Sequence, residues 1–244
     1  SIRLASRGHR VTLLDAGEKL GGNLMPATVP PHKQSLERLL DNMIHQVESI
    51  DVKVELSKKA DIEDIKKSGF DRIVVATGGS PVRPDLPGIE NPKVMTALEV
   101  LQGKETGKTV IVVGGGLIGC ETAEFLSDRG KTVFLVEMLP RIAFDIGPIN
   151  RWVYIKRIKE GGIQVMTRTK LMEITENGAL LEFEGKTEEM NADSVVLAVG
   201  MIPRNELAEE LKKAGLEILM AGDCVETGKV SDAIRSGFLA AQSL

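Results

Sequence analysis

The sequence contains only two cysteines, and their positions exclude several kinds of chemistry. Cys120 and Cys224 lie 104 positions apart and form no C-x-x-C motif. The chain therefore carries neither a disulfide framework nor a local dithiol redox pair. Two thiolates alone also cannot ligate an iron–sulfur cluster. We expect both to be small buried side chains beside glycine-rich turns.

Long hydrophobic runs and blocks of one charge are also missing. The longest apolar run, Val195 to Ile202, is far shorter than the roughly 20 residues of a membrane-spanning helix, and we interpret it as a buried strand. The 31 basic and 35 acidic residues are interspersed and give a net charge of -4. This distribution argues against nucleic acid as a partner, and the short apolar runs argue against a membrane. No signal peptide is recognisable, so the expected location is the cytoplasm.

Histidine is scarce as well. His9, His32 and His45 are the three histidines of the chain, and they fall in no arrangement typical of a catalytic triad. We therefore predict surface or packing roles for them, no catalytic side chain and no metal site. The length of 244 residues and the 42% hydrophobic content suit one large or two medium α/β domains.

The strongest motif is a glycine-rich turn after a strand-like run. Val110 to Val113 is a β-branched run typical of a buried parallel strand, and Gly114, Gly116 and Gly119 follow it in the pattern G-x-G-x-x-G. The first glycine permits a tight turn, and the second lets the backbone approach a pyrophosphate. The third lets the following helix pack closely on the strand. The motif predicts a dinucleotide-binding βαβ unit.

The residues after this turn complete that unit. Leu117 and Ile118 open the helix, whose free N–H groups would face the phosphates. Glu137 ends the second strand, 23 positions after Gly114. A carboxylate there can accept both ribose hydroxyls of NAD but would repel the 2′-phosphate of NADP. The sequence therefore favours NADH over NADPH, although Arg141 could still reach a phosphate.

An incomplete copy of this unit lies at the start of the sequence. Residues 5–15 and 126–137 share the order helix end, glycine, strand, acidic residue. A second echo links residues 194–200 to the strand that ends at Thr77 and Gly78. The first copy lacks its opening strand and glycine loop, and no initiating Met is present. We therefore expect a chain truncated at its N-terminus.

The remaining segments predict alternating helices and strands. We expect helices at 33–49, 62–67, 149–159 and from 231 to the end, strands at 10–15, 52–56, 72–76, 163–167 and 217–221, and an antiparallel meander over 171–190 with a turn at Asn177-Gly178. Residues 25–31 are expected to form a proline-punctuated crossing segment, and Pro81, Pro84 and Pro87 to mark a linker.

With these motifs placed, the chain resembles the flavoproteins with two dinucleotide-binding domains of the pyridine-nucleotide reductase type. Five segments, residues 20–24, 76–81, 113–121, 205–211 and 222–226, are similar to iron–sulfur reductases whose other half is an old-yellow-enzyme-like barrel. Examples are 2,4-dienoyl-CoA reductase, 2-enoate reductase and trimethylamine dehydrogenase. The implied fold is α/β, with two Rossmann-like three-layer domains that each carry a small antiparallel β element.

The resemblance also implies a domain layout and a set of cofactor contacts. Residues 1–82 plus 201–244 would form an FAD-binding-type domain, and residues 83–200 an inserted NAD(P)-binding domain. The implied FAD contacts are Asp15 on the adenosine ribose, Gly21 and Gly22 near the phosphates, Thr77 and Gly78 along the cofactor, and Asp223 on the ribityl chain or pyrophosphate. Gly200 joins the glycine-turn residues among the expected cofactor-binding positions.

The activity implied by the resemblance is hydride transfer from NADH to FAD. Electrons would then pass to an iron–sulfur cluster and FMN in an N-terminal barrel domain outside this sequence, where an enoate or enoyl-CoA-type substrate is reduced. Because the family's first glycine loop is absent here, we expect weak FAD binding or none. Two alternatives stay open: a nucleotide-binding fragment without turnover, and the electron-input subunit of a glutamate-synthase-like complex. The sequence indicates neither the substrate nor the oligomeric state.

Overall fold

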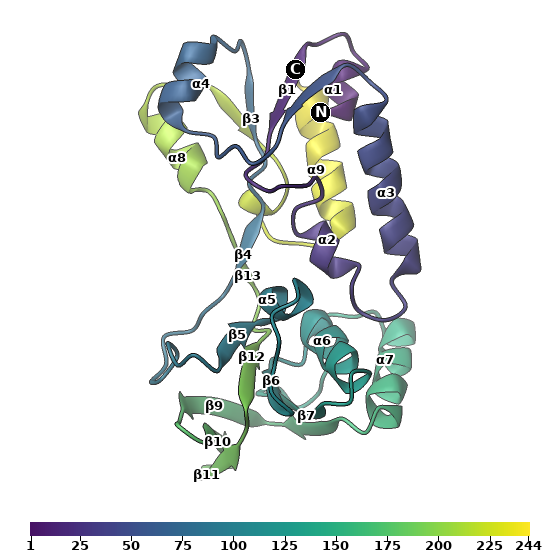
Figure 1. The fold of residues 1–244 in the computed structure, drawn as a ribbon, viewed down its shortest axis with the longest axis vertical. Helices are drawn as coiled ribbons and strands as arrows, with labels where there is room; N and C mark the ends of the chain where they lie inside the picture. The colour runs from purple at the N-terminus through teal and green to yellow at the C-terminus, as the bar shows by residue number, and fades with distance from the viewer. The chain divides into compact units, whose positions relative to one another are not determined.

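The computed structural model describes residues 1–244, which divide into two compact units. Unit 1 comprises Ser1–Thr28, Gln34–Ser80 and Met201–Leu244, and unit 2 comprises Val29–Lys33 and Pro81–Gly200. Figure 1 shows the course of the chain through both. Each unit has its own parallel strands and its own hydrophobic core.

Unit 2 is built on a five-stranded parallel sheet in the order β5-β12-β6-β7-β8. Its strands are β5 (Val94–Thr96), β6 (Thr109–Val113), β7 (Thr132–Glu137), β8 (Gln164–Thr167) and β12 (Ser194–Leu197). Every residue of β12 is buried, as a sheet covered on both faces requires. From β6 the chain proceeds to one side of the sheet, and β12 lies on the other. The carboxyl ends of β6 and β12 therefore form the switch point where such sheets bind ligands.

Three layers make up unit 2. The helices α5 (Ala97–Leu101), α6 (Leu117–Ser127) and α7 (Pro148–Glu160) contribute to one core cluster, and the antiparallel sheet of β9 (Thr169–Ile174), β10 (Gly178–Phe183) and β11 (Lys186–Asn191) to another. Side chains of β6 alternate between the two clusters, since Val110 and Val112 belong to the cluster that includes Cys120 of α6, whereas Ile111 belongs to the one that includes Leu171 of β9. This confirms the α/β prediction with its small antiparallel element.

Unit 1 contains two separate pairs of parallel strands. β1 (Val11–Leu14) pairs with β2 (Val52–Glu55), and β3 (Ile73–Val75) pairs with β14 (Ile218–Met220). The sequence predicts such an interruption, because the opening strand of a dinucleotide-binding sheet lies between its neighbours. All four residues of β1 are only half-buried, in contrast to the buried strands of unit 2.

The helices of unit 1 are α1 (Ile2–Ala5), α2 (Leu24–Ala27), α3 (Gln34–Glu48), α4 (Ile62–Ser68), α8 (Glu206–Lys213) and α9 (Val230–Gln242). The α4 helix begins where the Asp61 carboxylate accepts a hydrogen bond from the Asp64 amide at 2.9 Å, and it is followed by Gly69 at a φ of 63°. One core cluster joins α4 and α8 to the β3–β14 pair through Ile65, Val75, Ala208, Leu211 and Cys224.

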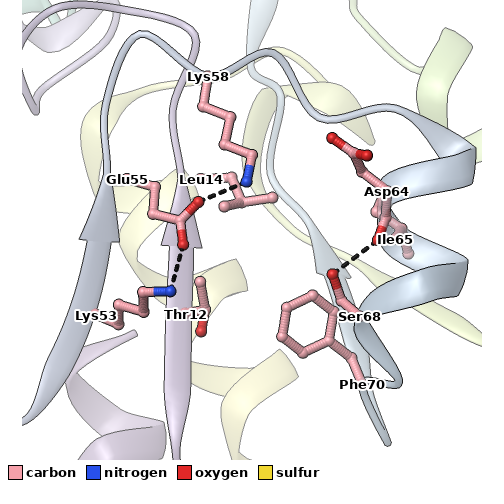
Figure 2. Close-up of a pocket in the computed structure, with 9 residues that line it drawn as sticks. All are labelled: Thr12, Leu14, Lys53, Glu55, Lys58, Asp64, Ile65, Ser68 and Phe70. Carbon is pink, nitrogen blue, oxygen red and sulfur yellow. Dashed lines mark hydrogen bonds and ion pairs between the residues drawn. The ribbon is translucent and has the colours of Figure 1, made fainter.

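A cavity of about 260 Å³ lies beside the β1–β2 pair (Figure 2). Thr12 and Leu14 line it from β1, and residues 64–70, which lead into β3, line its other side. Lys53, Glu55 and Lys58 also line it, and Glu55 pairs with Lys53 at 2.7 Å and with Lys58 at 2.6 Å (Figure 2). The cavity beside β1 is thus bordered by charged side chains that already form ion pairs with one another.

One expectation about local structure was wrong. The apolar run Val195–Ile202 is not one strand, because Gly200 turns the chain at a φ of 110° between β12 and β13 (Met201–Pro203). β13 pairs instead with β4 (Gly79–Pro81). The proline-punctuated crossing segment after Asn23 begins within a short helix, α2 (Leu24–Ala27). Nowhere does a helix combine the length and apolar character needed to cross a membrane.

We predict that Leu211→Ala lowers the free energy of unfolding of unit 1 by about 2–5 kcal/mol, because it removes a fully buried side chain and leaves a cavity. Leu239→Ala is the matched control, since Leu239 is 52% exposed on α9, and it should cost less than about 0.5 kcal/mol. Urea denaturation followed by circular dichroism measures both. Equal shifts would contradict the core assigned to α8.

Candidate dinucleotide-binding site

Backbone contact between α6 and the sheet fixes the glycine turn at the switch point. Gly114 has a φ of 105°, and a Cβ there would lie 2.3 Å from the Ala198 carbonyl oxygen at the end of β12. A Cβ on Gly119 would lie 1.7 Å from the Gly114 carbonyl oxygen. Only glycine fits at both positions, so the turn and the first turn of α6 are held against β6 and β12.

At Gly116 the backbone itself does not require glycine. Its φ of -71° is open to any residue, and the nearest heavy atoms to a Cβ there belong to the Asp145 carboxylate, the closest at 3.2 Å. The space before α6 is therefore kept free of side chains from the turn itself. Leu117 and Ile118 follow at the helix start, with the Leu117 amide directed outward to Asp145 and the Ile118 side chain 41% exposed.

Glu137 lies directly beside this turn. Its Oε2 accepts a hydrogen bond from the Gly115 amide and its Oε1 one from the Leu139 amide, both at 2.7 Å. The residue is 5% exposed. Each carboxylate oxygen has a second lone pair, so Glu137 can hold the turn and still accept a ribose hydroxyl. Gly200, at the far end of β12, is exposed, and its Cβ position is empty within 4 Å.

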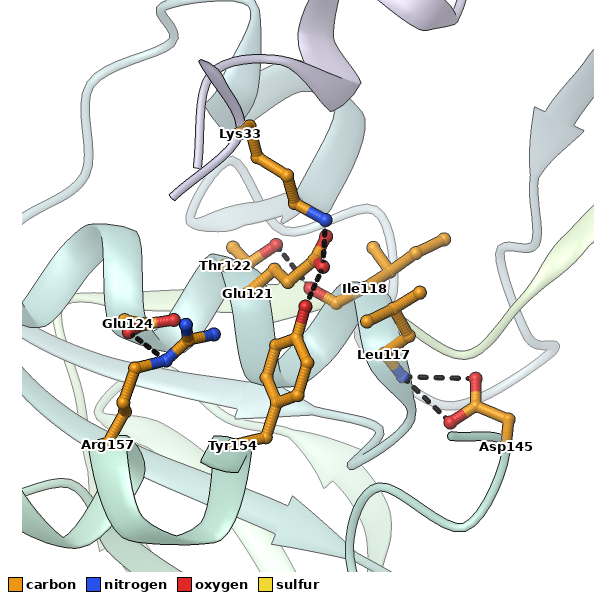
Figure 3. Close-up of polar contacts among 9 residues, drawn as sticks. All are labelled: Lys33, Leu117, Ile118, Glu121, Thr122, Glu124, Asp145, Tyr154 and Arg157. Atoms are coloured by element: carbon orange, nitrogen blue, oxygen red, sulfur yellow. Dashed lines mark hydrogen bonds and ion pairs between the residues drawn. The ribbon is translucent and has the colours of Figure 1, made fainter. Parts of the chain in front are cut away.

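Two buried carboxylates on α6 were not among the predicted site residues (Figure 3). Glu121 accepts a hydrogen bond from Tyr154 Oη at 2.6 Å and pairs with Lys33 Nζ. Glu124 pairs with Arg157 Nε at 2.8 Å. Each carboxylate is 7% exposed and compensated by a cation. The position of Glu121, two residues after Gly119, could have marked it as a candidate in the sequence. Its partners Lys33 and Tyr154, however, lie 88 and 33 positions away along the chain.

Burial shifts the pKa values of two members of this cluster, Glu124 and Tyr154. It raises the pKa of the Glu124 carboxyl above the usual value, against the opposing charges of Arg157 and His32. It also raises the pKa of the Tyr154 hydroxyl, with the hydrogen bond to Glu121 adding to the effect. Tyr154 therefore stays protonated and donates. The cluster is a fixed polar support for α6 rather than an acid–base site.

Cys120 is chemically quiet despite its position behind the glycine turn. It is fully buried, and burial followed by the negative charge of Asp145 raises the pKa of its thiol to about 12. The thiolate, which is the reactive form, is therefore absent near neutral pH. Both cysteines are free and buried, as expected from the sequence.

In unit 1, three of the predicted FAD-binding residues follow the β3–β14 pair. Thr77 and Gly78 come after β3, and Asp223 lies in the short 3-10 helix Gly222–Cys224 after β14. Because these two strands are parallel and paired, all three residues lie at the carboxyl ends of the strands, on the same side of the pair. Thr77 Oγ1 donates to the Arg204 carbonyl, and Asp223 Oδ1 accepts from the Gly228 amide at 3.2 Å.

The other three predicted FAD-binding residues, Asp15, Gly21 and Gly22, follow β1. Asp15 Oδ1 accepts a hydrogen bond from the Gly17 amide at 2.8 Å, and the loop then reaches Gly21 and Gly22, with φ values of 124° and 49°. Asn23, which was not predicted as a site residue, joins the two groups, because its Nδ2 donates to the Gly79 carbonyl at 2.9 Å. Asn23 lies in residues 20–24, one of the segments on which the family resemblance rests. The neighbouring glycines could therefore have identified it as a site residue.

The two sets of residues differ in how well they fit a dinucleotide. In unit 2 the glycine turn, the helix start and the Glu137 carboxylate lie together, and the Asp145 carboxylate lies against the Leu117 amide. In unit 1 no glycine turn accompanies β1 or β3 in the way that Gly114–Gly119 accompanies β6. Unit 2 therefore fits a bound dinucleotide, and unit 1 supplies only part of a site.

Unit 2 has a parallel sheet with a glycine turn at its switch point, and unit 1 repeats part of this arrangement with a second set of parallel strands. These features define a Rossmann-type dinucleotide-binding protein. The chain belongs to the pyridine nucleotide-disulphide oxidoreductase family, whose sequence profile matches residues 1–232. The members of this family bind FAD and NAD(P)H, and its homologues are NAD(P)H-dependent flavin oxidoreductases.

Individual relatives agree with the expected resemblance. The chain is 38% identical to NADH oxidase of Thermoanaerobacter brockii, over 98% of this chain and 38% of the relative. It is 34% identical to cinnamate reductase of Clostridium sporogenes, over 98% of this chain and 36% of the relative. A solved 2-naphthoyl-CoA reductase matches with a TM-score of 0.94 at 28% identity, over 100% of this chain and 38% of that one. The chain thus spans well under half the length of these proteins.

We predict that Gly119→Ala destabilises unit 2 by more than about 3 kcal/mol, because its Cβ would overlap the Gly114 carbonyl and force α6 away from β6. Gly237→Ala is the matched control. Gly237 lies within α9 with empty space around its Cβ, so alanine should be neutral or stabilising by about 0.5–1 kcal/mol. Thermal unfolding of both variants tests the contact, and similar melting temperatures would contradict it.

Proposed function

We propose that this chain is the NADH-oxidising module of a flavin oxidoreductase. When bound, NADH supplies a hydride from its nicotinamide, which FAD accepts as two electrons and a proton. The electrons would go on to a further domain with FMN and an iron–sulfur cluster, where an enoate or enoyl-CoA-type substrate is reduced. The observation that carries the proposal is the glycine turn at the ends of β6 and β12, with the α6 N-terminus beside it.

Unit 2 supports the role of dinucleotide binding. The Leu117 amide faces an anion, and Gly116 leaves room for one. The residues of this chain would bind the pyrophosphate through the start of α6 and the adenosine ribose through Glu137. Hydride transfer needs positioning more than acid–base groups, and the compensated cluster around Glu121 supports α6 without supplying one.

Glu137 supports NADH rather than NADPH as the nucleotide. Its carboxylate is held in place by the Gly115 and Leu139 amides. A 2′-phosphate beside it would meet a fixed negative charge with no cation paired to it. Arg141 is exposed, and no ion pair joins it to Glu137.

The further domain is supported by the share of the relatives that this chain leaves uncovered. It spans 38% of the NADH oxidase of Thermoanaerobacter brockii. Each unit also exposes apolar side chains that a partner could cover: Ile149 and Trp152 on α7 are 86% and 66% exposed, and Phe238 and Leu239 on α9 are 46% and 52% exposed. We propose a barrel domain of the same protein as the partner and the cytoplasm as the location.

One observation favours a second candidate, a nucleotide-binding chain without turnover. β1 and β3 each lack a strand neighbour on one side, and the FAD-type residues of unit 1 form two groups. FAD binding by this chain alone should therefore be weak. Under this second candidate, unit 2 binds the nucleotide but no hydride acceptor is held in unit 1.

We predict that the purified chain carries little or no flavin, and that added FAD is needed for NADH-dependent reduction of an artificial electron acceptor. Visible absorbance after purification and turnover with and without FAD measure this. Stoichiometric, tightly bound flavin would contradict the weak-binding prediction. NADH binding without turnover at saturating FAD would favour the second candidate over the first.

We also predict that NADH binds more tightly than NADPH, and that Glu137→Gln weakens NADH binding about tenfold, as expected from the loss of a hydrogen bond to a charged group. NADPH binding should change less, because the repulsion is lost as well. Glu160→Gln is the control, since its side chain is 62% exposed at the end of α7. Isothermal titration calorimetry gives the affinities, and tighter NADPH binding by the unmodified chain would overturn the assignment.

A further inference from the structure

The start of α6 already holds an anion, and that anion belongs to the chain itself. Asp145 lies in the loop Arg141–Gly147, between β7 and α7. The Leu117 amide donates to both of its carboxylate oxygens, each at 3.0 Å (Figure 3). The same carboxylate is the nearest group to a Cβ on Gly116. Asp145 therefore occupies the space in front of the glycine turn.

The loop that carries Asp145 is anchored to this turn. The Ala143 amide donates to the Gly115 carbonyl at 2.6 Å, and the buried Ile142 side chain lies against Gly115. Ala143 has a φ of 55°, a left-handed conformation that costs an alanine about 1–2 kcal/mol. The two anchors hold this unfavourable backbone in place and deliver Asp145 to the helix start.

The carboxylate itself is only lightly held. Asp145 is exposed, and none of the salt bridges of the chain includes it. Its stabilisation comes from one amide and from the positive end of α6, where an exposed anion gains modestly and is screened by salt. Rotation of one side chain releases it, while the anchored part of the loop can stay.

A dinucleotide pyrophosphate needs the same place. It binds to free N–H groups at a helix start, and the Leu117 amide cannot serve a phosphate oxygen and the Asp145 carboxylate together. Two anions at this distance also repel each other. We propose that Asp145 is an internal competitor for the pyrophosphate, which fills the anion position of the free chain and must leave before the dinucleotide binds. This proposal rests on the proposed function of unit 2.

Such competition weakens the apparent affinity for NADH. The apparent dissociation constant equals the intrinsic one divided by the fraction of chains whose helix start is free. Asp145→Ala should therefore bind NADH more tightly, by about two- to fivefold, the equivalent of the interaction of an exposed charge with a helix end. Asp145→Asn keeps an oxygen that can accept from Leu117 but lacks the charge, so its gain should be smaller. A purely structural cap predicts the opposite result, since its loss would loosen α6 and weaken binding.

The test uses the full chain and isothermal titration calorimetry with three probes. NADH and ADP-ribose carry the pyrophosphate and should both bind more tightly to Asp145→Ala, whereas adenosine carries none and should not change. Asp128→Asn is the matched control, because Asp128 is an exposed carboxylate at the opposite end of α6 and its loss changes the net charge equally. A gain in affinity cannot arise from misfolding.

The outcomes separate this proposal from the function it rests on. If the unmodified chain binds NADH and the Asp145 variants bind it equally or more weakly, the competition is disproved and the dinucleotide site stands. A gain that also appears with adenosine or in Asp128→Asn likewise overturns the proposal. If neither the unmodified chain nor the Asp145 variants bind NADH or ADP-ribose, both this proposal and the function proposed for unit 2 fall.

Discussion

The close approach of α6 to β6 is the constraint on which the rest of unit 2 depends. The Gly119 backbone lies so near the Gly114 carbonyl that no side chain fits between them. That contact fixes the direction of α6 and brings its first amides to the switch point of the sheet. It also sets the depth at which Glu121 and Glu124 are buried, and hence their need for Lys33 and Arg157. Nucleotide recognition and internal charge compensation are thus consequences of one backbone contact.

The two units show how strongly a parallel sheet depends on its central strands. In unit 2, β6 has neighbours on both sides and its interior residues are fully buried. In unit 1, β1 and β3 have one neighbour each, and β1 stays half-buried throughout. The same kind of sequence, an aliphatic run that ends in an acidic residue or a glycine, therefore gives a closed core in one case and an open edge in the other.

Much of this architecture could be predicted from the sequence because its signals are local. The order of glycines, the aliphatic runs and the acidic ends of strands indicated the sheet of unit 2 and its turn. The partners of Glu121 could not be predicted, because Lys33 and Tyr154 reach it only through tertiary packing. Asp145 was missed for the same reason, since its loop is positioned by the hydrogen bond from Ala143 to Gly115 and by the buried side chains of Ile142 and Ala143. The Val195–Ile202 run was misjudged because Gly200 was treated as part of a strand.

The pairing of Lys33 with Glu121 bears on how this protein can be divided experimentally. Residues Val29–Lys33 belong to unit 2, although the chain on both sides of them belongs to unit 1. A piece cut at 81 and 200 would keep the whole five-stranded sheet but lose the cation that compensates a carboxylate only 7% exposed. Glu121 would then be left with the Tyr154 hydroxyl alone, and an uncompensated buried charge is strongly destabilising. The smallest autonomous form of the nucleotide-binding unit is therefore discontinuous in sequence, and an expression boundary drawn from the sheet alone would omit a residue that its central helix requires.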